Sequence, residues 1–195
     1  MNAVSLWYLA PLAYLLGSIP FGVIFARLAG NKNLQQTGSG NIGATNVART
    51  VGKKWAFLTL IGDLLKGVAP PWIGSILGME PPHSGVILPF LGLLAVIGHM
   101  FPIWLKFKGG KGVATTCGVF LFLAPKALLP AFAVFIILAA VSGYISLGSL
   151  GGASSIPIVL WILGASWPIT ILGVMVTGLI FFTHRENIRR LLRGK

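Results

Sequence analysis

The stretch from Val113 to Thr183 reads VATTCGVFLFLAPKALLPAFAVFIILAAVSGYISLGSLGGASSIPIVLWILGASWPITILGVMVTGLIFFT, and its one charged side chain is Lys126. Long apolar runs of this kind are typical of membrane-spanning helices, each of which needs about 20 predominantly apolar residues. The whole chain of 195 residues is 55% hydrophobic and only 9% charged, whereas soluble domains carry about a quarter charged residues. We therefore expect an all-α integral membrane protein with a single transmembrane domain over residues 1–195.

Three more apolar segments precede this stretch, at about 4–28, 55–77 and 86–105. The first is longer than the apolar core of a signal peptide, so we expect it to be retained as a span. Lys and Arg gather in the connectors after the first and third segments and in the C-terminal tail, but not in the connector 78–85. Because cytoplasmic loops carry the excess of Lys and Arg, the sequence predicts the N-terminus outside and the C-terminus in the cytoplasm.

Residues 113–183 then begin and end on the cytoplasmic side, so they must contain an even number of spans. Two spans of about 30 residues are too long without strong tilt, and four spans of about 14–17 residues are short. Breaks near 125–130, 142–155 and 166–168 favour four. We predict a bundle of seven transmembrane helices with some short or re-entrant members, with five spans as the alternative.

The charge balance indicates an anionic partner. The chain has fifteen Lys and Arg against three acidic residues, Asp63, Glu80 and Glu186, for a net charge of +12. This excess suits membrane lipid headgroups or an anionic substrate. No nucleic-acid partner is expected, because the cations lie in short connectors rather than on a soluble face. The sequence has no His or Cys cluster with metal-ligand spacing, so we expect no metal and no cofactor. Cys117 is predicted to be a small buried residue.

The first segment that could carry chemistry is TGSGNIGATNVAR, residues 37–49. It matches the glycine pattern of dinucleotide-binding folds, but a membrane segment precedes it instead of a strand, which excludes that fold. A glycine-rich turn at the start of a helix still offers backbone N–H groups to an anion, and Arg49 adds a fixed positive charge. The predicted phosphate-binding residues here are Gly40, Asn41, Gly43, Thr45 and Asn46, together with Ser39 and Arg49. A plain polar loop is the alternative.

The second segment is GHMFPIWLKFKGGKGVATT, residues 98–116. It is not a P-loop, because Lys111 is followed by Gly112 rather than by Ser or Thr. It nevertheless combines glycine backbone, cations and hydroxyl groups entering the next helix, so it predicts a second anion pocket. The candidate residues are Lys108, Gly109, Gly110, Lys111, Gly112 and Thr115. The alternative, a basic cytoplasmic loop, explains Lys106 but not the glycines.

The third segment is HRENIRRLLRGK, residues 184–195. Helical spacing places His184, Asn187 and Arg190 on one face, with Arg185 as a further candidate phosphate ligand. The alternative is a basic tail that binds anionic lipid.

Two isolated features lie within the apolar segments. Asp63 and Lys66 are three residues apart and can pair along a helix. An intramembrane pair of this kind is either functional or a structural brace. His99 is a lone polar residue of the sort that more often bonds between helices than catalyses.

Taken together, the three motifs resemble those of the bacterial membrane acyl-phosphate:glycerol-3-phosphate acyltransferases. The resemblance implies a multi-pass protein of seven spans in the bacterial inner (cytoplasmic) membrane, with an active site that faces the cytoplasm. It implies transfer of a fatty acyl group from acyl phosphate to the 1-hydroxyl of sn-glycerol 3-phosphate, giving 1-acylglycerol 3-phosphate (lysophosphatidic acid) and phosphate as the first step of phospholipid synthesis. The soluble enzyme that makes acyl phosphate is a further expected partner.

The residues fit that chemistry, because both substrates carry phosphate and the mixed anhydride is already activated. Its departing phosphate can accept the proton of the attacking hydroxyl, so no protein catalytic diad is required. The predicted catalytic residues are Ser39, Arg49 and Lys108, which hold the acyl phosphate, and His184 and Asn187, which close the pocket. The segment 109–112 is expected near glycerol 3-phosphate. The alternatives are a membrane transporter for organophosphate or other anions and a non-catalytic lipid-binding scaffold.

Overall fold

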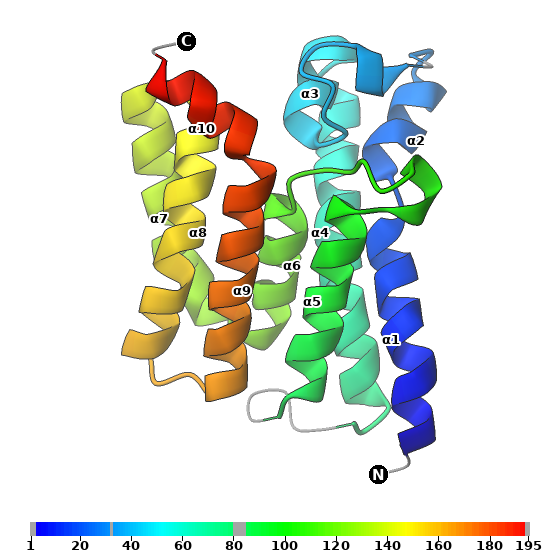
Figure 1. Cartoon of the computed structure of the whole chain (residues 1–195), viewed down its shortest axis with the longest axis vertical. Coiled ribbons are helices and arrows are strands. Elements are labelled where there is room, and N and C mark those ends of the chain that lie inside the picture. The colour runs from blue at the N-terminus through cyan, green and yellow to red at the C-terminus, as the bar shows by residue number, and fades with distance from the viewer. Residues whose placement is uncertain (1–2, 32, 80–84, 194–195) are drawn as a thin grey trace.

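The computed structural model describes residues 3–31, 33–79 and 85–193, and every regular element in this part of the chain is a helix. The elements are α1 (Ala3–Ser18), α2 (Phe21–Leu28), η1 (Leu34–Gln36), α3 (Ala44–Thr50), α4 (Lys53–Ile76), α5 (Ile87–Met100), η2 (Ile103–Leu105), α6 (Val113–Leu123), α7 (Pro125–Ser142), α8 (Ile145–Ile162), α9 (Trp167–Thr183) and α10 (Arg185–Leu192). The long helices stand side by side, and α3, α10 and the connector from α5 to α6 gather at one end (Figure 1). The predicted all-α class is confirmed.

Five stretches of the described chain are long and apolar enough to cross a membrane: 8–28, 53–76, 87–105, 125–142 and 145–162. The helices α9 and α10 meet at 62° and together form a sixth candidate. Helix α6 is apolar but has only 11 residues, or about 16 Å at 1.5 Å per residue, which is shorter than the hydrocarbon core of a typical bilayer. Length and composition therefore support five or six spans in this part of the chain, and the count of seven stays a prediction.

Two of the expected boundaries need correction. The first apolar segment is broken at Ile19 and Pro20, because proline lacks the N–H that would continue the helix. The small residues 142–155 were expected to form a break, but α8 begins at Ile145 and runs through most of them. Small residues there bring two helices together: a Cβ on Gly148 would lie 2.6 Å from the carbonyl oxygen of Phe135 on α7. The turn itself is confined to Gly143 and Tyr144.

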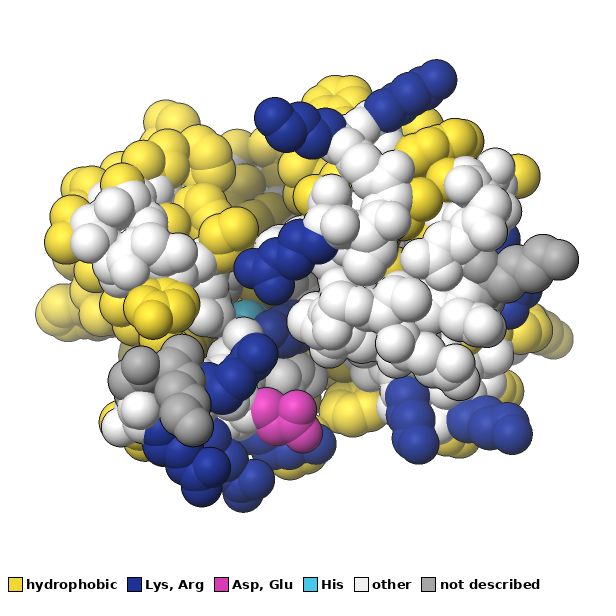
Figure 2. All heavy atoms as spheres, turned by 90° about the horizontal axis from the view of Figure 1, so that it is seen from above, with side chains coloured by type: hydrophobic (Ala, Val, Ile, Leu, Met, Phe, Trp, Pro, Cys, Tyr) yellow, Lys and Arg dark blue, Asp and Glu magenta, His cyan; other side chains and the backbone are white. Residues whose placement is uncertain are grey.

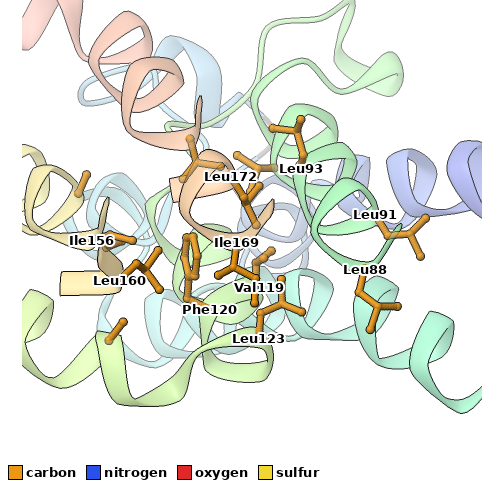
Figure 3. Close-up of a cluster of buried hydrophobic side chains, with 14 of the residues drawn as sticks. Leu88, Leu91, Leu93, Val119, Phe120, Leu123, Ile156, Leu160, Ile169 and Leu172 are labelled. Atoms are coloured by element: carbon orange, nitrogen blue, oxygen red, sulfur yellow. The ribbon is translucent and has the colours of Figure 1, made fainter. Parts of the chain in front are cut away.

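The main core surrounds the short helix α6. Buried side chains from four helices meet there, namely Leu88, Leu91, Leu93, Val119, Phe120, Leu123, Ile156, Leu160, Ile169 and Leu172 (Figure 3). On its other side α6 packs closely against α4, where Gly118 faces the carbonyl oxygen of Leu64, at 2.0 Å from the position of an added Cβ. Membrane helices associate through such small-residue contacts, since lipid offers them no hydrophobic driving force.

A smaller core holds the first motif at the end of the bundle. It consists of Val23, Ala26, Leu34, Ile42, Val47 and Ala56, from α2, the connector 29–43, α3 and α4. Burial of this cluster fixes the connector and α3 against the start of α4. The glycine-rich segment is thus a packed part of the fold rather than a loose loop.

Candidate active site

A cavity of about 850 Å³ lies between the α3–α4 region and helices α6 to α10. Its polar end is lined by Ser39, Asn41, Thr45, Asn46, Arg49, Asp63, His99, Lys111, Thr116, His184, Asn187 and Arg190. Its apolar part is lined by side chains that include Leu60, Ile61, Leu121, Leu128, Leu129, Phe132, Phe135 and Ile156. Viewed from the end that carries α3 and α10, Lys and Arg side chains surround a hollow in which a His side chain is visible (Figure 2). The three sequence motifs thus meet at one cavity.

Asn46 organises the first motif. Its side-chain oxygen accepts a hydrogen bond from the Ser39 backbone N–H at 2.8 Å. Its amide nitrogen donates to the carbonyl oxygens of Asn41 at 2.8 Å and Thr37 at 3.0 Å. The side chain is buried, and these bonds use both of its polar atoms. Asn46 therefore shapes the loop that presents Ser39, rather than offering its own amide to a ligand.

The connector between α5 and α6 reverses direction before it reaches the cavity. Lys106 and Phe107 both adopt left-handed backbone conformations, with φ of 52° and 62°. The N–H groups of Gly109 and Gly110 then donate to the carbonyl oxygens of Met100 and His99, at 3.1 Å and 3.0 Å. These two amides are occupied within the protein, so the glycines serve close backbone packing and do not offer free donors to an anion.

Lys111 is held at the cavity by the third motif. Its ammonium group donates to the side-chain oxygen of Asn187 at 2.6 Å. The backbone carbonyl of Lys111 accepts a hydrogen bond from the Thr183 hydroxyl at 3.2 Å. Burial lowers the pKa of Lys111 to about 8, and the positive charges of Arg190 and Arg49 act in the same direction. Three cations therefore face one small region, where a bound dianion would relieve their mutual repulsion.

His184 contributes a neutral ring. Its Nδ1 lies 2.8 Å from the carbonyl oxygen of Ile180. Since a carbonyl only accepts, Nδ1 carries the proton and Nε2 is left as an acceptor. Burial lowers the pKa of His184 to about 4; the bond to Ile180 opposes this shift, and the charge of Lys111 adds to it. At neutral pH this side chain adds shape and an acceptor nitrogen, but no charge.

The cavity wall contains ten of the sixteen site residues predicted from sequence: Ser39, Asn41, Gly43, Thr45, Asn46, Arg49, Lys111, Gly112, His184 and Asn187. The other six, Gly40, Lys108, Gly109, Gly110, Thr115 and Arg185, lie outside it. Lys108 has an exposed side chain beyond the chain reversal, and its carbonyl accepts a hydrogen bond from Gln35. Arg185 lies over the ring of Phe182, at 4.7 Å from the ring centre.

Sequence reasoning gave no site role to several residues that the structure brings to the wall. Arg190 lines the cavity beside Asn187, and the spacing of His184, Asn187 and Arg190 already pointed to it. Asp63 and His99 also line it. No local motif marks them as site residues, since their place depends on how α4 and α5 pack.

The cavity combines a cationic end, suited to phosphate groups, with an apolar part large enough for a hydrocarbon chain. Comparison with known proteins is consistent with this chemistry: residues 7–194 match the family model described as glycerol-3-phosphate acyltransferase.

The chain belongs to the glycerol-3-phosphate acyltransferase family. The glycerol-3-phosphate acyltransferase of Syntrophomonas wolfei is 43% identical over 183 residues, which cover 94% of this chain and 91% of that protein. That of Trichlorobacter lovleyi is 48% identical over 182 residues, or 93% of this chain and 91% of that one. The predicted resemblance is thus confirmed, and with it the predicted acyltransferase activity toward glycerol 3-phosphate.

Solved structures of another member of the glycerol-3-phosphate acyltransferase family have the same fold. The crystal structure of PlsY (YgiH), an integral membrane glycerol 3-phosphate acyltransferase, in its glycerol 3-phosphate form has a TM-score of 0.89 and 40% identity, and the match covers 97% of this chain and 93% of that one. Its lysophosphatidic acid form has a TM-score of 0.88 over the same shares of both chains. The predicted integral membrane character is confirmed, and the transporter and scaffold alternatives are set aside.

Proposed function

We propose that this acyltransferase takes its acyl group from an acyl phosphate and transfers it to the 1-hydroxyl of sn-glycerol 3-phosphate. The observation that carries the proposal is the cavity itself, in which a cluster of three cations continues into an apolar part. An acyl phosphate has the same two-part character, with a charged head and a hydrocarbon tail. The glycerol 3-phosphate and lysophosphatidic acid forms of PlsY support the acceptor and the product.

The cationic end holds the two phosphate groups. Arg49 presents a planar guanidinium that can bind phosphate oxygens in pairs. Lys111 and Arg190 add two further charges to the cavity wall. Ser39 supplies a hydroxyl, while Asn187 holds the Lys111 ammonium group in place. Lys108 takes no part in this arrangement, since its exposed side chain is not part of the cavity wall.

The apolar part holds the acyl chain and opens to the side. On α4 its wall includes Leu60 and Ile61, and on α7 it includes Leu129 and Phe132. All four side chains are exposed to the surroundings of the bundle. In a membrane these edges face lipid, so a fatty chain enters from the bilayer without crossing water.

The reaction needs no protein nucleophile. The 1-hydroxyl oxygen of glycerol 3-phosphate forms a bond to the acyl carbon, and the bond from that carbon to the phosphate oxygen breaks. The departing phosphate takes the hydroxyl proton, so the products are 1-acylglycerol 3-phosphate and monohydrogen phosphate. The protein contributes position and charge stabilisation, because the cations draw negative charge toward the leaving phosphate.

In the membrane, we propose seven spans with the N-terminus outside and the cavity opening to the cytoplasm. The cationic end carries α3, the connector before α6 and α10, and the positive-inside rule assigns that end to the cytoplasm (Figure 2). Since the related proteins come from bacteria, the corresponding compartment is the inner membrane. Acyl phosphate is then supplied by a soluble enzyme on the same side.

Phosphate release from purified protein in lipid tests the proposed donor. Hexadecanoyl phosphate with glycerol 3-phosphate is expected to give equal amounts of phosphate and lysophosphatidic acid, whereas hexadecanoyl coenzyme A is expected to give no lysophosphatidic acid. The variants Arg49→Ala and Lys111→Ala are expected to lose most of the rate. Lys108→Ala is the matched control, because it removes a lysine of the same loop that lies off the wall. A rate that falls with Lys108→Ala but not with Lys111→Ala would contradict the assignment of the phosphate site.

A further inference from the structure

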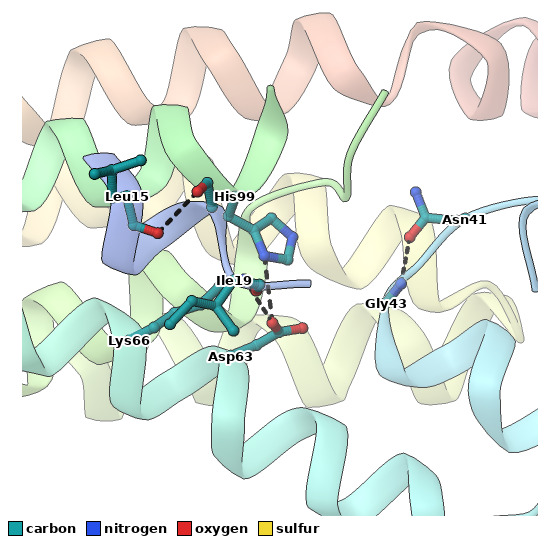
Figure 4. Close-up of polar contacts among 8 residues, drawn as sticks. Leu15, Ile19, Asn41, Gly43, Asp63, Lys66 and His99 are labelled. Atoms are coloured by element: carbon teal, nitrogen blue, oxygen red, sulfur yellow. Dashed lines mark hydrogen bonds and ion pairs between the residues drawn. The ribbon is translucent and has the colours of Figure 1, made fainter. Parts of the chain in front are cut away.

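Three ionisable side chains meet within the spans, beside the cavity. Asp63 and Lys66 come from α4 and His99 comes from α5, and none is more than 4% exposed. Lys66 Nζ lies 2.9 Å from Asp63 Oδ1, and His99 Nδ1 lies 3.4 Å from the same oxygen (Figure 4). Charged side chains inside a membrane are energetically costly, so they occur where they pair with one another or take part in function.

Lys66 is used entirely for structure. Besides its contact with Asp63, its ammonium group donates to the carbonyl oxygen of Ile19 at 2.7 Å. That carbonyl lies at the break between α1 and α2, where it also accepts a hydrogen bond from the Phe21 backbone N–H at 3.1 Å. Lys66 is not part of the cavity wall. It therefore balances the charge of Asp63 from behind and leaves the cavity-facing side of the carboxylate open.

Asp63 has one carboxylate oxygen without a partner. Both of its contacts use Oδ1, and Oδ2 has no partner among the described residues. Figure 4 shows the second oxygen directed away from Lys66 and His99. Among the described residues, Asp63 is the one carboxylate on the cavity wall. A carboxylate oxygen accepts hydrogen bonds and repels phosphate, so it suits a hydroxyl group of the ligand.

Asp63 lies close to the phosphate-binding loop. The His99 ring contacts Asp63 on one side, and on the other its Nε2 lies 2.0 Å from the position of an added Cβ on Gly110. Gly110 directly precedes Lys111, so a single imidazole ring separates Asp63 from the phosphate-binding loop. Asp63 also lies about 15 Å along α4 from Lys53. It thus lies deeper in the bundle than the start of α4, at the inner side of the polar end of the cavity.

We propose that Asp63 Oδ2 accepts a hydrogen bond from the 1-hydroxyl of glycerol 3-phosphate and so directs that hydroxyl at the acyl carbon. His99 turns its Nδ1 toward Asp63 Oδ1, at 3.4 Å, so this nitrogen is not directed at a ligand. Asp63 orients the hydroxyl and keeps no proton, since the proton leaves with the phosphate as described above. This inference rests on the proposed function, because it assumes that glycerol 3-phosphate binds in this cavity. It does not depend on the identity of the acyl donor.

The test compares Asp63→Asn with the double variant Asp63→Asn/Lys66→Met. The single variant leaves a buried lysine without its counterion, whereas the double variant removes both charges. We expect kcat to fall about 10- to 100-fold in both, the usual effect of losing a hydrogen bond to a charged group. The KM for glycerol 3-phosphate is expected to change little, because the bond strengthens in the transition state.

A second measurement separates hydroxyl recognition from general damage. Propyl phosphate has the phosphate but no hydroxyl, so its inhibition constant is expected to be the same in wild type and in both variants. Equal thermal stability of wild type and the double variant provides the folding control. If Asp63→Asn alone fails to fold, kcat and the inhibition constant of propyl phosphate are compared between wild type and the double variant.

Three results would overturn the proposal. The first is wild-type kcat in Asp63→Asn. The second is recovery of wild-type kcat in the double variant, which would assign the defect to the unpaired Lys66. The third is a parallel loss of propyl phosphate binding, which would make Asp63 a structural support of the phosphate pocket. A wrong acyl donor would give a different result from a wrong role for Asp63, because wild-type protein would then release no phosphate from acyl phosphate. The variants would then be compared with the donor that does support turnover.

Discussion

The depressed pKa of Lys111 predicts a specific pH dependence of the reaction. A lysine is charged below its pKa, and burial with two neighbouring arginines lowers that of Lys111 to about 8. In the free enzyme, about nine-tenths of the molecules therefore carry this charge at pH 7 and about one-tenth at pH 9. Since kcat/KM reports groups of the free enzyme, kcat/KM for glycerol 3-phosphate should fall about 10-fold between pH 7 and pH 9.

The Lys111→Arg variant isolates this effect, because arginine stays charged across the whole range. Its kcat/KM is expected to be lower than that of wild type at pH 7, since the contact with Asn187 depends on the lysine geometry, but to stay flat up to pH 9. The assay is phosphate release with both acyl phosphate and glycerol 3-phosphate well below saturation, so that the rate reports the free enzyme, corrected for hydrolysis of the donor at each pH. Lys108→Arg is the matched control and should keep the wild-type profile.

Two outcomes would refute the reasoning. A wild-type profile that stays flat to pH 9 would mean that Lys111 does not titrate in this range. A decline in Lys111→Arg as steep as that of wild type would mean that another group sets the profile. In either case the three-cation description of the phosphate site would need revision.

Three further predictions concern packing around the site. Gly110→Ala would place a Cβ 2.0 Å from the His99 ring. The resulting displacement of Lys111 should lower the rate of phosphate release at least about 10-fold. Gly178→Ala is the control, because the space around Gly178 is open, and it should keep the wild-type rate. Asn46→Ala removes the bonds that shape the first motif and should lower the free energy of unfolding by about 1–3 kcal/mol, measured by thermal unfolding in detergent; unchanged stability would show that the loop holds without it. Ile156→Trp should lower kcat/KM about 10-fold more for hexadecanoyl than for octanoyl phosphate, and an equal effect on both donors would place the acyl chain elsewhere.

The fold was predictable from sequence where a single physical rule decides it. Apolar runs without charges indicate membrane helices wherever they occur, and the turn at Gly143 lies at the edge of an expected break. The break at Pro20 falls inside the first expected span and was not predicted. The stretch from Gly148 to Gly152 was misread, because small residues weaken a helix in isolation but let two membrane helices pack closely. The packing of α8 against α7 shows that close helix packing prevails over the weak helix propensity of these residues.

The site was predictable to the level of motifs, but not of every residue within them. Lys108 and Lys111 look alike in sequence, and the chain reversal at Lys106 and Phe107 separates them. The glycines beside Lys111 look like anion-binding donors until their amides are found bonded to Met100 and His99. The Asp63–Lys66 pair was open to a functional or a structural reading in the sequence, and only the packing of α4 places Asp63 on the cavity wall and Lys66 off it. Long-range packing decides each of these cases, and no short spacing encodes it.

The proposed sideways entry past the exposed wall residues Leu60 and Ile61 on α4 and Leu129 and Phe132 on α7 gives the two substrates different concentration scales. Glycerol 3-phosphate arrives from water, so its supply is counted in moles per litre. A donor that enters from the bilayer is counted as a mole fraction of the lipid around the protein. Adding inert lipid at a fixed total amount of donor should therefore slow the enzyme, as surface dilution does for catalysts that work at an interface. The proposed product keeps the acyl chain, so the same route would return it to the bilayer rather than to water.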